Sequence, residues 1–106
     1  MHASLPPLAW LDDFCLSMMA ATGEGLRHSE SDTGEENVKE VVFQFQSHMT
    51  IKSIRLISEL LHSWAKANEC GTIGRVKRDG TKMIAKIVIK HQFGNLKIRH
   101  PLGDKK

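Results

Sequence analysis

The side chains best suited to acid–base or nucleophilic chemistry in this sequence are six histidines and two cysteines. None of them forms an HExxH or paired Cys/His pattern, and the chain has no P-loop, GxSxG or GxGxxG motif. Cys15 and Cys70 show no metal-ligand or redox spacing, so we expect two reduced, buried thiols. The sequence therefore predicts no catalytic residue, no metal ligand and no cofactor.

His100 is the histidine whose neighbour suggests a reaction. Arg99 lies beside it at the end of the last expected strand. A cation at that point could hold a phosphate while the imidazole acts as a general base. A small RNase-like activity is therefore the minor alternative to a non-enzymatic function.

Positive charge is the stronger chemical signal, and it is concentrated at one end of the chain. The net charge of the whole sequence is only +3. Residues 1–40 carry eight acids against two cations, whereas residues 72–106 carry ten cations against two acids. Such asymmetry points to a charged partner and says little about the fold.

The basic end of the chain has the alternating pattern of antiparallel strands, most regularly in residues 72–100. Asp79-Gly80 predicts a two-residue hairpin turn that opposes Val76 with Met83. Gly94-Asn95 predicts a second tight turn. Opposed residues share a face, and both turns assign the same residues to the same faces. The result is a three-stranded meander with one apolar and one cationic face.

Seven cations share the second face, together with three aliphatic side chains. The face has no aromatic side chain on which an unpaired base could stack. We therefore expect phosphate-backbone contacts to nucleic acid, with duplex RNA or DNA favoured over a single strand. The predicted nucleic-acid-binding residues are Arg75, Lys77, Lys82, Lys86, Lys90, Lys97 and Arg99.

The elements before this sheet predict the remaining organisation. Apolar side chains at helical spacing indicate a helix over residues 5–20, and a second helix is expected over residues 51–68. Residues 38–46 alternate as a strand. The expected divisions are an N-terminal amphipathic helix at 1–21, an acidic flexible loop at 22–37 and a single α+β domain at 38–106. The predicted fold is thus α+β, an N-terminal helix followed by β-α-β-β-β, with the helices packed on one sheet face.

A protein–protein interaction module, with an acidic protein surface or a second copy as partner, is the alternative function. The aliphatic side chains among the cations could form the centre of such an interface. The N-terminal helix offers another surface for a partner or for homodimerisation. The predicted interface residues are Leu8, Leu11, Phe14, Met18, Ile73, Ile84 and Val88. No apolar run approaches the ~18 residues of a membrane span, and we expect an intracellular, cytoplasmic protein.

Overall fold

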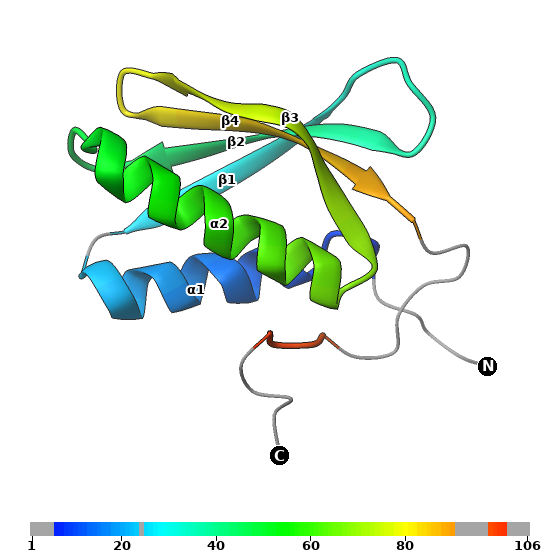
Figure 1. Ribbon diagram of the computed structural model, residues 1–106, viewed down its shortest axis with the longest axis horizontal. Helices are drawn as coiled ribbons and strands as arrows, with labels where there is room; N and C mark the ends of the chain where they lie inside the picture. The colour runs from blue at the N-terminus through cyan, green and yellow to red at the C-terminus, as the bar shows by residue number, and fades with distance from the viewer. Residues whose placement is uncertain (1–5, 24, 91–97, 102–106) are drawn as a thin grey trace.

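The computed structural model describes residues 6–23, 25–90 and 98–101. They form two helices packed on one face of a four-stranded antiparallel sheet (Figure 1). This confirms the predicted α+β class and the placement of the helices. In chain order the elements are α1 (Trp10–Thr22), β1 (Leu26–Asp32), β2 (Val38–Phe45), α2 (Ile51–Ala67), β3 (Cys70–Asp79) and β4 (Lys82–Ile89).

A helix followed by a β-hairpin occurs twice along the chain. The first unit is α1 with β1 and β2, and the second is α2 with β3 and β4. The strand order β1-β2-β4-β3 places one strand of each hairpin in the centre of the sheet and the other at an edge. The edges of the sheet are therefore β1 and β3.

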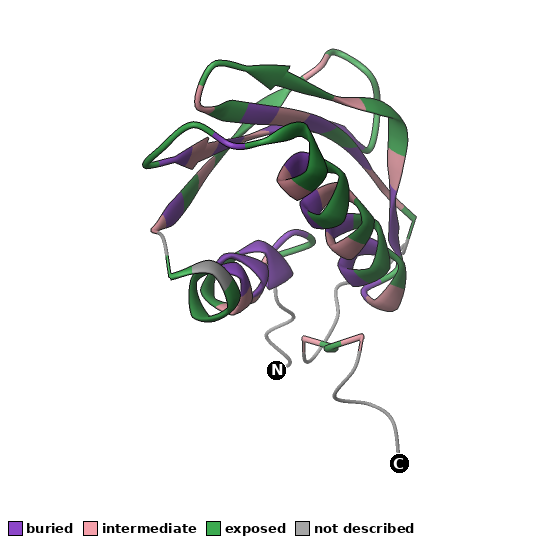
Figure 2. Ribbon diagram, turned by 60° about the vertical axis from the view of Figure 1, so that its left-hand side comes forward, coloured by how far each residue is buried: buried purple, intermediate pink, exposed green. Residues whose placement is uncertain are grey.

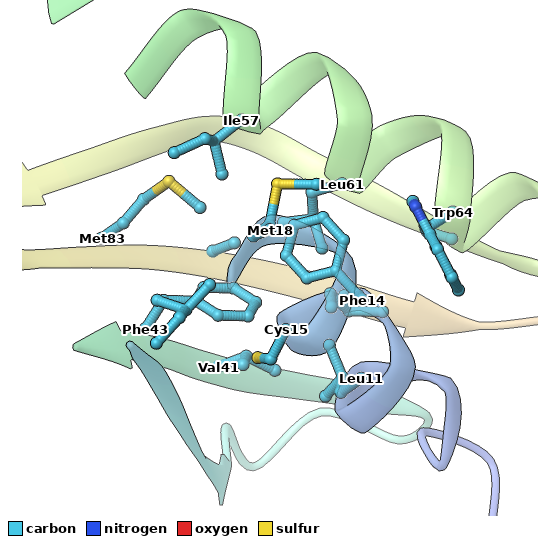
Figure 3. Packing of buried hydrophobic residues seen from close by; sticks show 14 of the residues in the cluster. Leu11, Phe14, Cys15, Met18, Val41, Phe43, Ile57, Leu61, Trp64 and Met83 are labelled. Carbon is cyan, nitrogen blue, oxygen red and sulfur yellow. The ribbon is translucent and has the colours of Figure 1, made fainter. Parts of the chain in front are cut away.

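The core lies between the two helices and the sheet (Figure 3). Phe14 of α1 is fully buried and makes edge-to-face contacts with Phe43 of β2 and Trp64 of α2. The ring centroids lie 5.6 Å and 6.1 Å apart. Each such contact contributes about 0.5–1.5 kcal/mol beyond the burial of area. Phe14 thus joins both helices to the central strands.

Strand β1 corrects the prediction of a flexible loop over residues 22–37. Leu26 is the buried apolar residue of this strand, and it lies opposite Phe45 of β2. The other residues of β1 are polar, and their pairing with β2 continues as far as Asp32 opposite Lys39. Backbone pairing to an apolar neighbour forms the strand despite its composition, because strand preference depends strongly on context.

The hairpin between β3 and β4 turns one residue later than predicted. Asp79 pairs with Lys82, so the turn residues are Gly80 and Thr81. Of these two, Gly80 has a positive φ of 64°, which glycine adopts without strain. Met83 consequently lies opposite Arg78, and the predicted pairing of Val76 with Met83 is wrong.

The predicted third strand of the meander falls largely on residues 91–97, which lie outside the described residues. Residues 98–100 are described and form no strand. Their backbone is bonded instead to the buried side chain of Asn68 at the end of α2. Asn68 Nδ2 donates to the Arg99 carbonyl at 2.8 Å, and the Arg99 N–H donates to Asn68 Oδ1 at 2.9 Å.

Replacing Asn68 by Ala should lower the free energy of unfolding by about 2 kcal/mol, because it leaves the Arg99 backbone groups without these partners. Urea unfolding monitored by circular dichroism measures this loss. Lys66→Ala, an exposed change on the same helix, is the control and should stay within about 0.5 kcal/mol of the wild type. A loss for Asn68→Ala no larger than that of the control would contradict the assigned role.

Candidate nucleic-acid interface

Both helices of the described residues pack on one face of the sheet, and neither covers the opposite face (Figure 1). Buried residues gather where the helices meet the sheet, whereas the strands carry many exposed residues (Figure 2). Met83, Ala85 and Ile87 of β4 point toward the helices and are fully or almost fully buried. The alternate residues of β4 therefore point to the uncovered face.

The strand pairings identify the other residues of this uncovered face. Lys82 of β4 lies between Gln44 of β2 and Asp79 of β3, and Gln44 in turn lies opposite Arg27 of β1. Two further rows cross the sheet in the same way. Their members are Ser29, Val42, Ile84 and Lys77 in one row, and Ser31, Glu40, Lys86 and Ile73 in the other.

Five of the seven cations predicted from the sequence lie on or beside this face. Lys77, Lys82 and Lys86 are on it by register. Lys90 follows β4, and its side chain extends over Gly71 of β3, where a Cβ would lie 3.1 Å from Lys90 Cε. Arg75 lies at the β3 edge.

The remaining two predicted cations are not part of the described face. Lys97 lies outside the described residues. Arg99 lies near the end of α2, because Asn68 binds its backbone there. Its assignment to the sheet face is therefore corrected.

Arg27 is the exposed cation of this face that the sequence analysis missed. Its position on the face follows from the pairing of β1 with β2. The sequence predicted a loop for this segment, so it gave no strand register that could place Arg27 on a face. The alternation of Leu26, His28 and Glu30 with Arg27 was the available signal. That signal is weak, because a single residue of the strand is a large aliphatic.

A bulge in β3 shapes the centre of the face. Between the pairs Ile73–Lys86 and Lys77–Ile84, three residues of β3 oppose Ala85 alone. Gly74 in this bulge has a φ of 67°. Beside the bulge is a hollow of about 190 Å³, and its lining includes Arg75, Lys77, Lys86 and Glu40.

The charge of the face is strongly one-sided. It carries six cations, namely Arg27, Arg75, Lys77, Lys82, Lys86 and Lys90, against the two acids Glu40 and Asp79. Within the part of the chain that the structure describes, ion pairs involve other basic side chains: His28, Lys39 and His100. The cations of the face therefore remain available to an anionic partner.

The residues predicted for a protein interface divide into two groups. Ile73, Ile84 and Val88 lie on the uncovered face, where Ile73 is 42% exposed and the other two are half-buried. The other four predicted residues are buried in the core, because α1 and the turn before it pack against the sheet and α2. These four are Leu8, which precedes α1, and Leu11, Phe14 and Met18 of α1. The large apolar residues exposed on α1 are Leu16 and Met19.

The candidate nucleophiles and bases do not assemble into a reactive site on the described residues. Burial raises the pKa of the Cys15 thiol to about 12, with a smaller contribution from the charge of Asp12. Burial is also the main cause that raises the pKa of Cys70. Both free thiols are thus held in their unreactive, protonated form at neutral pH.

His100 packs on the helices and is separate from the cationic face. Its ring contacts Trp64 with centroids 4.6 Å apart, and its Nε2 lies 3.4 Å from Asp13 Oδ2. The described residues contain no group of three or more histidine, cysteine or acidic side chains placed to hold a metal ion.

Comparisons of the chain with family models, with curated proteins and with solved structures give no match. Among the described residues, no helix has the length and hydropathy that crossing a bilayer requires. Function must therefore be inferred from the geometry of the chain itself.

The raised pKa of Cys15 predicts a loss of stability in alkali. Because the folded state holds this proton more tightly than the unfolded state, the stabilisation is present below about pH 9 and is lost as the pH rises toward 12. Cys15→Ala should make the fall in the free energy of unfolding above about pH 9 shallower. Urea unfolding over a series of pH values measures the slope, and Ser17→Ala on the same helix should keep the wild-type slope.

Proposed function

We propose that this chain binds nucleic acid through the uncovered face of its sheet, as a non-enzymatic binding or regulatory protein. The observation that carries the proposal is a sheet face on which the described residues place six cations, two acids and no covering helix. Like charges on one sheet face repel each other and cost stability. A polyanion in contact with the face removes that repulsion and releases its own counterions.

The spacing of the lysines suits a phosphate backbone. Lys82, Lys86 and Lys90 recur at every fourth residue along and just after β4, which places successive side chains about 13 Å apart. A duplex presents one charge per ~1.7 Å of its axis, so each lysine has a phosphate within reach in any register. Binding by this row is independent of base sequence.

A duplex fits the face better than a single strand does. The described residues of the face include no aromatic side chain for base stacking, which supplies about 1–3 kcal/mol per base in single-strand-binding proteins. Its centre is instead aliphatic, with Val42 beside Ile84. The proposal places the protein in the cytoplasm, where its two free cysteines remain reduced.

A protein interface is the second candidate, and the aliphatic centre of the face is the observation that favours it. Ile84 and Val88 flank Lys86 on the uncovered face of β4, and Ile73 of β3 lies opposite Lys86. Two copies joined through this face would bring six cations against six, which disfavours a homodimer there. An acidic protein surface is the partner that this candidate requires.

Reversing two charges on the face should abolish binding to duplex DNA and RNA at low salt. The variant Lys82→Glu with Lys86→Glu places two acids on the proposed interface, on either side of Ile84 in β4. Its matched control, Lys52→Glu with Lys66→Glu, makes the same change in net charge on exposed positions of α2. Fluorescence anisotropy at two salt concentrations measures the affinity of each variant and of the wild type for the duplex.

The control should bind with an affinity close to that of the wild type, because its lysines lie on the opposite side of the molecule. The wild-type affinity should fall steeply with salt, with a slope of about −0.9 per phosphate contacted. Equal losses in the two variants would point to non-specific attraction and contradict the proposal. Absence of wild-type binding to either duplex at low salt would also contradict it.

A further inference from the structure

A second cationic surface lies around the edge of the sheet, in a groove between α2 and β3. The groove has a volume of about 820 Å³. Arg55 of α2 and Arg75 and Arg78 of β3 line it, with Glu59 as the acid among its lining residues. Its lining is therefore positively charged, although it lies on the helix side of the sheet.

Two hydrogen bonds fix the walls of this groove. His62 Nδ1 and Thr72 Oγ1 lie 3.0 Å apart and join α2 to β3. Arg78 Nη1 donates to the Met49 carbonyl at 3.2 Å, which joins β3 to the segment before α2. The groove is held open between these two connections, so little ordering is needed when a ligand binds.

Arg75 connects the groove with the uncovered face. It belongs to the lining of both the groove and the hollow beside the bulge. Bulges re-aim side chains at sheet edges, and here the bulge at Gly74 carries Arg75 to the boundary between the two surfaces. The positive surface therefore continues from the sheet face around β3 to Arg55.

The bulge also argues against an added peptide strand as the occupant. A peptide that extends a sheet needs a continuous row of backbone groups along the edge strand. In β3 the ladder register shifts between Ile73 and Lys77, in the middle of the groove. An edge interrupted in this way is a feature that protects against strand addition.

We propose that a single-stranded extension of the bound nucleic acid leaves the sheet face around β3 and lies in the α2–β3 groove. Its phosphates are held by Arg55, Arg75 and Arg78. This inference rests on the proposed function and adds the preferred substrate class, a duplex with a single-stranded extension. The groove runs between one helix and one strand, and its three arginines can follow the phosphates of one extended chain.

The other groove residues suit a backbone of this kind. Arginine matches phosphate with two parallel hydrogen bonds, and Ser58 and Ser63 add hydroxyl groups to the lining. Ile51 is 60% exposed and offers apolar contact to sugars or bases. A positively charged groove that follows the backbone is the common feature of sequence-independent single-strand binding.

The test compares a blunt duplex with the same duplex carrying a short oligothymidylate extension, in DNA and RNA versions. The wild type should bind the extended duplex about tenfold more tightly than the blunt one at low salt. The slope of log K against log salt should be steeper for the extended duplex by about 2, since each single-strand phosphate contact contributes about 0.7. Fluorescence anisotropy over a salt series gives both quantities.

Arg55→Gln isolates the groove, because Arg55 lies on α2 and touches no part of the uncovered face. This variant should bind the blunt duplex as the wild type does, bind the extended duplex about twofold more weakly than the wild type and lower the salt slope for the extended duplex by about 0.7. Lys66→Gln removes an exposed cation of the same helix outside the groove. Lys66→Gln should bind the extended duplex more tightly than the blunt duplex by the same factor as the wild type.

The outcomes separate the two proposals. Wild-type protein that binds both duplexes equally well would overturn the groove assignment and leave the sheet face as the binding surface. A gain from the extension that is undiminished in Arg55→Gln, or that falls equally in Lys66→Gln, would also overturn it. Wild-type protein that binds neither duplex removes the proposed function and the inference together.

Discussion

The contact of Phe14 with Phe43 and Trp64 is the interaction on which the two-layer arrangement depends. These three rings come from α1, β2 and α2, so a single buried cluster fixes both helices against the centre of the sheet. Because both helices pack on the same face of the sheet, neither covers the opposite face. That uncovered face carries most of the cations described above.

The sequence correctly predicts those helices and strands whose own side chains show a clear apolar periodicity or a capping residue. Helix α2 begins where Thr50 accepts a hydrogen bond from the Ser53 N–H, and β2, expected as an alternating strand, buries Val41, Phe43 and Phe45. Both elements carry an apolar periodicity that identifies the buried side. Such local signals predicted the α+β class and most of the cationic residues that the structure places together.

The features that could not be predicted depend on partners distant in the chain. β1 is a strand because β2 lies beside it, and its composition alone indicates a loop. The bulge in β3 shifts the pairing with β4, so that the hairpin turns at Gly80-Thr81. The sequence pattern does not reveal how many residues a bulge contains, so this register could not be predicted. Arg99 was assigned to a strand by alternation, but the buried amide of Asn68 competes for its backbone. Tertiary hydrogen bonds decided each case.

The opposite chemistry of the two sheet edges has a consequence before any contact is made. β1 carries Glu30 and Asp32 against Arg27 and leads into Glu35 and Glu36, whereas β3 carries Arg75, Lys77 and Arg78 against Asp79. The separation gives the molecule an electric dipole across the strands. The field of a polyanion, the class of ligand proposed above, would exert a torque on this dipole and turn β3 toward the polyanion during diffusion. The edge that would meet the proposed ligand first is then the one where the open face and the groove join.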